Sequence, residues 1–414
     1  MDADGTTAVP PTPRVVLGVS GGIAAYKAAE VLRGLAESGC DVTVVPTAAA
    51  LNFVGAATWS ALSGKPVSAS VWDDVDRVAH VRLGQQADII LVAPATADLM
   101  ARAAHGRADD LLASVLLTAR CPVLLAPAMH TEMWEHPATR DNVAVLRERG
   151  VIVLEPAVGR LTGADSGPGR LPEPGALVAA VHDVLRRGGA PTDLAGLRVI
   201  VSAGGTRESW DPVRFIGNVS SGRQGVELAR TALTRGARVT LVAAHMDVDP
   251  PAGADVVRVS SAEQMRVAMH EATPGSDVVV MAAAVADFRP AEAGRRKLKR
   301  GEAGEVLTVD LVQNPDILLE LVHKRGSATS PLIVGFAAET GDADHTVLDL
   351  AREKLARKGC DLLVVNDVSD GRAFGRPDNE VVVLGQDGSS RHVRLSGKAA
   401  VADAIWDVAV RLRP

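Results

Sequence analysis

Two glycine-rich segments of this 414-residue sequence each lie between a predicted strand and a predicted helix. The first reads Ser20-Gly21-Gly22-Ile23, and the second begins at Gly204-Gly205-Thr206. Glycines at such a junction let backbone N–H groups approach an anion, and the N-terminus of the next helix favours negative charge. The first segment lacks GxGxxG spacing, so one phosphate fits it better than a dinucleotide, although simple packing would also account for a lone glycine turn. The two segments predict one nucleotide site in each half of the chain.

Small and polar residues follow two more predicted strands of the first half. Ala95-Thr96-Ala97 comes after the third strand, and Met129-His130 comes after the fourth. Open α/β sheets bind their ligands at the carboxyl ends of their strands, so these residues are expected to face the same ligand as the first glycine turn. A ligand with a single phosphate, such as FMN, is the best match.

His80 is the candidate for acid–base chemistry in the first half, within the run Arg77-Val78-Ala79-His80-Val81-Arg82-Leu83. Its simplest interpretation is a hydrogen-bonded histidine on a half-buried strand. Beside a bound flavin, the same imidazole would transfer protons near neutral pH.

In the second half, Asp287 follows a predicted buried strand, and a basic run at 295–300 contains Lys297. A basic run alone indicates a solvated face or a nucleic-acid patch. The glycine turn of this half, taken alone, also fits an NAD(P)-type site. Lys354 and Lys358 favour a triphosphate instead, because their i, i+4 spacing puts both ammonium groups on one helix face.

The composition limits the classes of protein that are possible. A net charge of −6 and a pI near 6.0 argue against a bulk nucleic-acid binder. The three cysteines are far apart and form no disulfide or metal-ligand spacing, which favours a reducing compartment. Residues 1–13 are polar and rich in proline, as in a disordered tail, and no apolar run is long enough to span a bilayer. We therefore expect a soluble, cytoplasmic protein.

Strands and helices alternate along the whole sequence, and the pattern restarts after a Gly/Pro cluster at 188–191. Aromatic residues make up only 3% of the chain, so the core must consist of Ala, Val, Leu and Ile, as in parallel sheets covered by helices. The prediction is an α/β fold with two doubly wound, Rossmann-like parallel sheets. Strands are predicted at 14–19, 41–46, 87–93, 122–126, 151–154, 197–203, 237–243, 277–284, 332–336 and 361–365, with a hairpin at 379–385 and 391–395.

Residues 14–186 resemble the homo-oligomeric flavin-containing cysteine decarboxylases, through Pro94-Ala95-Thr96-Ala97, Pro127-Ala128-Met129-His130 and the loop at 159–170. The resemblance implies a decarboxylase domain at 14–189. In such enzymes a bound flavin would take two electrons from the cysteinyl thiol group, which lets the carboxylate leave as carbon dioxide, and would return them in a final reduction. It also implies FMN contacts by Ser20, Gly21, Gly22, Ile23, Thr47, Ala95, Thr96, Ala97 and Met129.

The same resemblance makes His80 catalytic and the loop at 159–170 a substrate-covering flap containing Thr162, Asp165 and Arg170. Two positions depart from the family pattern. His130 stands where the family has an Asn that holds the substrate carboxylate, and an imidazole can still donate that hydrogen bond. Gly163 stands where the family has its proton-donating cysteine. The donor is left open among Thr162, another flap residue, a water molecule and a neighbouring subunit.

The second half, 190–414, resembles phosphopantothenate–cysteine ligase. The resemblance implies that Asn218 acts on an acyl-cytidylate, that Lys297 is catalytic, and that Mg²⁺ binds the CTP phosphates. Lysines and Mg²⁺ would offset the charge that develops on the transferring phosphoryl group. The implied CTP contacts are Ala283, Ala284, Asp287, Lys297, Asn314, Pro315, Asp316, Ile317, Phe336, Lys354 and Lys358.

Together the two resemblances imply successive steps of coenzyme A synthesis from 4'-phosphopantothenate, cysteine and CTP. They also imply trimers of the first half, with the flavin near a subunit boundary, and dimers of the second, which together would close a dodecamer. The main alternative is an NAD(P)H–flavin oxidoreductase, which would not need Lys297 or the pair Lys354 and Lys358. A second alternative is a flavin-binding regulatory protein without activity. No nucleic acid or membrane is expected as a partner.

Overall fold

A computed structural model of the chain describes residues 12–70, 72, 78–160, 166–188, 192–294, 296–297, 308–339, 346–367 and 378–413. The contacts within the chain divide it into two compact units, Met1–Thr192 and Asp193–Pro414. Part of the predicted tail, the flap residues 161–165 and residues 295 and 298–300 of the basic run lie outside the described residues.

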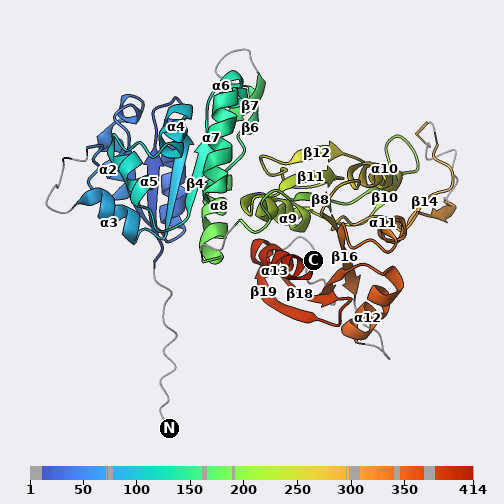
Figure 1. Ribbon diagram of the computed structural model, residues 1–414. Coiled ribbons are helices and arrows are strands. Elements are labelled where there is room, and N and C mark those ends of the chain that lie inside the picture. The colour runs from blue at the N-terminus through green and yellow to red at the C-terminus, as the bar shows by residue number, and fades with distance from the viewer. Residues whose placement is uncertain are drawn as a thin grey trace, which may run out of the picture. The chain divides into compact units, whose positions relative to one another are not determined.

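The first unit contains a five-stranded parallel sheet with the strand order β2-β1-β3-β4-β5 (Figure 1). This is a doubly wound order, in which the chain reverses direction across the sheet beside its first strand. The fold class predicted for this half is confirmed, and the strands lie within about two residues of their expected positions. They are β1 (Arg14–Val19), β2 (Asp41–Pro46), β3 (Ile89–Ala95), β4 (Val123–Pro127) and β5 (Ile152–Val153).

Helices cover both faces of this sheet, because successive strand residues point to opposite sides. Val15 and Leu17 of β1 join the core under α1 and α8, whereas Val16 joins the core under α4 and α5. The helices are α1 (Ala25–Glu37), α2 (Ala56–Ser63), α3 (Ala79–Gln86), α4 (Ala97–Ala104), α5 (Leu111–Thr118), α6 (Thr131–Glu135), α7 (Pro137–Glu148) and α8 (Pro174–Arg186), with a short 3₁₀ turn at Ala50–Asn52.

Two local features of the first unit differ from the sequence prediction. The run around His80 forms helix α3, so the interpretation of this histidine as part of a half-buried strand was wrong. An antiparallel hairpin of β6 (Ala157–Arg160) and β7 (Ser166–Arg170) was not predicted. It frames the flap segment on both sides.

The second unit contains an eight-stranded sheet in the order β12-β11-β8-β13-β16-β17-β18-β19. The first six strands run parallel, and β18 and β19 form the predicted antiparallel hairpin at one edge. The sheet is therefore mixed, and the fold class predicted for this half, a parallel sheet with an appended hairpin, is confirmed. The strands are β8 (Arg198–Ala203), β11 (Arg238–Ala243), β12 (Asp255–Arg258), β13 (Val278–Met281), β16 (Leu332–Glu339), β17 (Leu362–Asp367), β18 (Asp378–Gly385) and β19 (Ser390–Gly397).

Helices also cover both faces of the second sheet. One core contains side chains of α9 (Arg223–Thr234) and α13 (Lys398–Leu412), including the fully buried Trp406. The opposite core contains side chains of α10 (Ala262–Ala272), α11 (Ile317–Arg325) and α12 (Val347–Lys358). Among the described residues, no helix is both long enough and apolar enough to cross a membrane.

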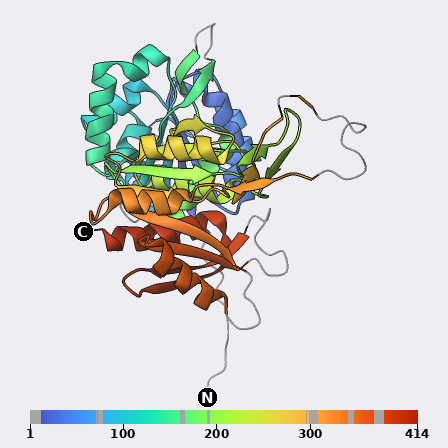
Figure 2. The ribbon, with the colours of Figure 1, turned by 90° about the vertical axis from the view of Figure 1, so that its right-hand side faces the viewer.

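Two short antiparallel ribbons project from one end of the second unit (Figures 1 and 2). One joins β9 (Arg207–Ser209) to β10 (Phe215–Gly217), and the other joins β14 (Phe288–Pro290) to β15 (Leu311–Gln313). β14 contacts β9, so the two ribbons lie side by side.

Candidate functional sites

A cavity of about 620 Å³ lies at the carboxyl ends of β1, β3 and β4 in the first unit, and its size suits a small organic ligand. Helix α1 begins directly after its glycine turn, so the N-terminus of that helix favours a bound anion. The cavity brings together residues from segments that are far apart in the sequence. The predicted residues that line it are Gly21, Gly22, Ile23, Thr96, Ala97, Met129, His130 and Arg170.

The two glycines of the turn have different roles. A Cβ atom on Gly21 would lie 2.4 Å from the Cβ of Ala49, so the chain packing itself requires glycine at this position. A Cβ atom on Gly22 would make only an ordinary contact, 3.7 Å from Thr96 Cγ2. The backbone at Gly22 is therefore open to the cavity, and the turn fits the phosphate of a bound flavin nucleotide.

Ser20 and Thr47 shape the turns beside the cavity. The Ser20 side chain is buried, with its hydroxyl donating to Pro94 O at 2.7 Å and accepting from Thr96 N at 2.9 Å. The hydroxyl of Thr47 accepts from Ala50 N at 3.2 Å. Ala95 is fully buried in β3. These three side chains hold the loops in place, and flavin contacts by them remain a prediction.

The structure does not bring His80 into this cavity. His80 is half-buried in the first turn of α3, where its carbonyl accepts a hydrogen bond from Thr118 Oγ1 at 2.9 Å. None of the described residues that line the cavity belongs to α3. If His80 acts at such a cavity, it must therefore be the cavity of a second copy of the chain.

No cysteine among the described residues lines the cavity. Cys40 is buried, and burial raises the pKa of its thiol. Burial raises the pKa of Cys121 to about 11. Neither thiol is therefore a candidate for the missing proton donor. Thr162, Gly163 and Asp165 lie outside the described part of the chain.

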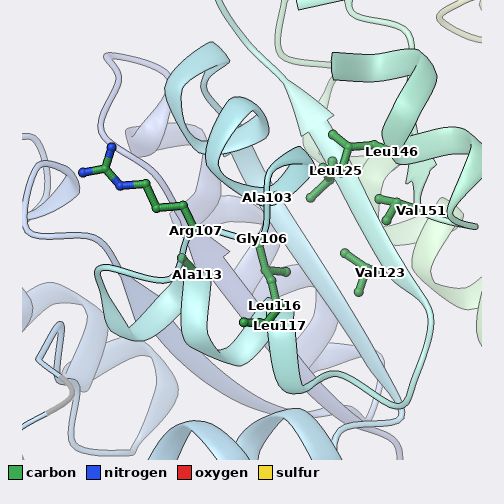
Figure 3. A pocket seen from close by; sticks show the side chains of 10 residues that line it. All are labelled: Ala103, Gly106, Arg107, Ala113, Leu116, Leu117, Val123, Leu125, Leu146 and Val151. Atoms are coloured by element: carbon green, nitrogen blue, oxygen red, sulfur yellow. The ribbon is translucent and has the colours of Figure 1, made fainter. Parts of the chain in front are cut away.

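The first unit also has an apolar pocket of about 80 Å³ against α4, α5, β4 and α7. Figure 3 shows leucine and valine side chains at this pocket, while the guanidinium group of Arg107 points away from them. The volume is too small for a nucleotide, and no charged side chain converges on it, so it is not a candidate site.

The second glycine turn packs tightly against neighbouring backbone. A Cβ atom on Gly204 would lie 2.4 Å from His245 O, and one on Gly205 would lie 2.6 Å from Asn218 O. Ala284 N donates to Gly204 O at 2.8 Å, and Thr206 N donates to Ala284 O at 3.2 Å. Strand β13 ends at Met281, although the strand was predicted to continue to residue 284. These bonds explain the difference, because the chain leaves the sheet after Met281 and bonds to the glycine turn instead.

Asn218 is brought to the predicted acyl-transfer position beside Ala283 and Ala284. Its side-chain amide donates to Val285 O at 3.0 Å, and the side chain is exposed. Ala283 N is held by the buried hydroxyl of Ser202 at 3.1 Å. The segment 283–286 is therefore hydrogen-bonded both to the glycine turn and to the side chain of Asn218.

Asn314 links this segment to the start of α11. The side chain of Asn314 is buried, and its amide donates to Ala286 O at 2.8 Å. The backbone N–H of Asn314 donates to Asp287 O at 2.8 Å. Arg289 donates to the Asn314 side-chain oxygen at 2.9 Å, and this cation was not singled out from the sequence. Asn314 thus contacts Ala286 and Asp287, and CTP binding by Asp287 and Asn314 stays a prediction.

Both predicted lysines lie on α12, as their spacing indicated, and one of them is paired with a carboxylate. Lys358 forms an ion pair with Asp316, whose other carboxylate oxygen accepts from Leu319 N at 3.1 Å and caps α11. The carboxylate of Asp316 therefore offsets the charge of Lys358. Lys354 is half-buried on the same helix.

The remaining predicted ligase residues lie on several elements. Lys297 is exposed on the segment after β14. Ile317 is the first residue of α11 and is buried in the core on that side of the sheet. Phe336 packs on the other face of the sheet, with the core of α9 and α13. Pro315 lies between the two contact residues Asn314 and Asp316. In the described ranges, no group of three or more His, Cys, Asp or Glu side chains is arranged to hold a metal ion.

Fold and sites together define a fusion of two α/β units, each with a glycine-rich turn after its first strand, the first with a cavity suited to a flavin. Residues 8–186 match the family described as Flavoprotein, and residues 194–412 match the family described as DNA/pantothenate metabolism flavoprotein C-terminal domain.

Relatives match over nearly the whole chain. The coenzyme A biosynthesis bifunctional protein CoaBC of Mycobacterium tuberculosis is 58% identical over 402 residues, which cover 96% of each chain. The protein of the same name from Mycolicibacterium smegmatis is 57% identical over 399 residues, and that of Vibrio cholerae is 40% identical over 395 residues, with 95% of this chain and 96% of each relative covered. The chain belongs to this family of bifunctional coenzyme A biosynthesis enzymes. The prediction of a flavoprotein joined to a second enzyme of coenzyme A synthesis is confirmed.

Proposed function

We propose that the chain catalyses two successive steps of coenzyme A synthesis. The second unit joins 4'-phosphopantothenate to cysteine at the expense of CTP, and the first unit decarboxylates the product in an FMN-dependent reaction. The observation that carries the proposal is the pairing of the two sites, each at a glycine turn, within a chain that matches its bifunctional relatives from end to end.

For ligation, a carboxylate must first be activated, because it is a poor acyl donor. Attack of the substrate carboxylate on the α-phosphate of CTP gives an acyl-cytidylate and pyrophosphate, and the amine of cysteine then displaces CMP. Asn218 already points its amide at the segment 283–286 and would donate to the developing oxyanion after leaving Val285 O. Removal of such a donor costs about 100- to 1000-fold in rate.

Basic side chains would neutralise the triphosphate, together with Mg²⁺ on the phosphates. Lys297, Lys354 and Lys358 are the lysines proposed for this role. Lys358 would exchange its ion pair with Asp316 for an ion pair with a phosphate oxygen. The bound phosphate would add negative charge beside the start of α11, which Asp316 caps. The pair therefore keeps the site neutral until CTP arrives.

For decarboxylation, FMN bound at the first glycine turn would supply the oxidation and reduction. The side chains of Ile23, Met129 and Met133 provide an apolar wall for its ring system. His130 begins α6 with an exposed imidazole, which can donate a hydrogen bond to the substrate carboxylate. His80 would act from a neighbouring subunit, because it lies outside the cavity of its own chain.

This arrangement requires an oligomer. We propose trimers through the first unit, dimers through the second, and a dodecamer that satisfies both contacts. The proposed location is the cytoplasm. Light scattering of the full chain checks the assembly, and a mass of a single trimer or dimer contradicts the dodecamer.

Two substitutions test the assignment of the activities to separate units. We expect His80→Asn to abolish decarboxylation of supplied phosphopantothenoylcysteine while CMP release continues. We expect Asn218→Asp to stop amide formation while decarboxylation continues. Loss of both activities from either substitution in a folded protein would contradict the proposal of two independent sites.

A further inference from the structure

The peptide group between Val285 and Ala286 is hydrogen-bonded at both of its polar atoms by side chains of the second unit. Its carbonyl oxygen accepts from Asn218 Nδ2 at 3.0 Å, and its N–H donates to Thr206 Oγ1 at 2.9 Å. The C=O and N–H of a trans peptide lie in one plane and point in opposite directions. The hydroxyl of Thr206 therefore also fixes the direction of the carbonyl that Asn218 binds.

Thr206 is well suited to hold this peptide group in one orientation. Its side chain is fully buried, and Ala286 is only 3% exposed, so water cannot easily replace the hydroxyl as the acceptor. The backbone of Thr206 binds the same segment, since Thr206 N donates to Ala284 O at 3.2 Å. One residue thus contacts the segment at two points, on either side of Val285.

The backbone at Thr206 packs closely against the backbone at Asn218. A Cβ atom on Gly205 would lie 2.6 Å from Asn218 O, and one on Gly217 would lie 2.5 Å from Thr206 O. Glycine directly before each of the two residues allows this approach. The hydroxyl and the amide therefore reach the peptide group from two chain segments whose relative position is fixed by packing.

We propose that Thr206 is a positioning residue of the ligase reaction. Its hydroxyl orients the Val285 carbonyl, which holds the Asn218 amide beside the acyl-cytidylate until the cysteine amine attacks the acyl carbon. The developing oxyanion then takes over the hydrogen bond from Asn218, and CMP leaves as the amide bond forms. This inference rests on the proposed role of Asn218. Thr206 acts through the peptide group, because its own side chain is fully buried.

The end of the segment proposed to contact CTP is held by other groups. Ala283 N donates to Ser202 Oγ at 3.1 Å, and Ala284 N donates to Gly204 O at 2.8 Å. Neither bond involves the Thr206 hydroxyl. Loss of this hydroxyl is therefore expected to slow acyl transfer while leaving CTP binding nearly unchanged.

The test removes the hydroxyl in the full-length protein. Thr206→Val keeps the branched shape of the side chain, and we expect kcat for CMP release to fall about 10- to 100-fold with little change in the KM for CTP. Acyl-cytidylate should accumulate in quenched reactions, because its formation precedes the slowed step. Thr206→Ser keeps the hydroxyl and should restore most of kcat. Thr206→Ala lacks the hydroxyl without adding volume and should show the same fall, which keeps the test valid if the valine variant does not fold.

Thr234→Val is the matched control for the loss of a buried hydroxyl. Thr234 lies in the last turn of α9, where its hydroxyl donates to Thr231 O at 2.9 Å, a bond within that helix. We expect this variant to keep the wild-type kcat and to accumulate no acyl-cytidylate. An equal fall of kcat in Thr206→Val and Thr234→Val would assign the effect to general destabilisation and overturn the proposal.

A double-mutant cycle with Asn218→Ala tests whether the hydroxyl acts through the amide. In the Asn218→Ala background, Thr206→Val should have little further effect on kcat, because the carbonyl no longer has an amide to position. Fully additive falls would overturn the proposal, as would a wild-type kcat in Thr206→Val or a fall in Thr206→Ser as large as in Thr206→Val. A wild type that releases no CMP from 4'-phosphopantothenate, cysteine and CTP would instead refute the proposed function of the second unit, and this inference with it.

Discussion

The buried hydroxyl of Ser20 joins the flavin-side glycine turn to the turn after β3, so Ser20→Ala should loosen both. The substitution leaves the part-buried Thr96 N–H without its partner at 2.9 Å, and an unsatisfied donor costs up to about 1–3 kcal/mol, the full cost applying when it is buried. Loss of the bond from the Ser20 hydroxyl to Pro94 O adds less to this cost, because Pro94 O still accepts a hydrogen bond from the Ser20 backbone N–H at 3.2 Å. We expect the first unit to lose about 2–3 kcal/mol of stability.

Hydrogen exchange measured by mass spectrometry on peptides from β1 and β3 gives the free energy of opening for this unit alone. Ser114→Ala is the matched control. Ser114 Oγ donates to Asp110 O, which also accepts the Ser114 backbone N–H, so the control should cost less than about 0.5 kcal/mol. FMN should also dissociate faster from the Ser20 variant. A loss below about 0.5 kcal/mol in β1 and β3, or an equal loss in the control, would refute the role assigned to the hydroxyl.

Two further predictions concern charges and thiols of the first unit. Arg102 pairs with Asp110 at 2.8 Å and with Asp109 at 2.6 Å, and Arg102→Met should lower the urea midpoint at pH 7. The hydrogen bond from Arg102 is the main cause that lowers the pKa of Asp109, so its stabilisation is present above the ordinary value of 3.8 and is lost as pH falls below it. Urea titrations should therefore show the two proteins converging as the pH falls below 3.8, and a constant difference would contradict this cause. Decarboxylation should also survive the replacement of Cys40, Cys121 and Cys360 together by alanine. Loss of carbon dioxide release in a folded, FMN-loaded variant would show instead that a thiol of the chain is the proton donor.

The sequence was sufficient to predict the elements with strong local signals. The glycine turns and the strands of both sheets, except the exposed edge strand β12, lie where periodicity and breaker residues indicated, since a buried parallel strand is a short, nearly continuous apolar run. The hairpin at the edge of the second sheet was also predicted from its turn residues. The short ribbons β6–β7, β9–β10 and β14–β15 were missed because three to five residues give no measurable period.

The details of the sites depended on contacts that no local pattern contains. The pairing of Lys358 with Asp316 and of Lys27 with Glu173 joins residues from separate elements, and only the folded sheet brings them together. The burial of the Ser20 hydroxyl likewise follows from the packing of β1 beside β3. The simplest interpretation of His80 put it on a half-buried strand, whereas residues 79–86 form helix α3.

The central claim is that one chain performs both reactions, and product analysis of the FMN-loaded protein tests it most directly. The protein is incubated with 4'-phosphopantothenate, cysteine and CTP, and the products are identified by mass. The account predicts CMP, pyrophosphate and carbon dioxide in equal amounts, with 4'-phosphopantetheine as the final product. Bleaching of the flavin absorbance by NADPH in the absence of CTP and cysteine, with no CMP released from the complete mixture, would contradict it and indicate an oxidoreductase.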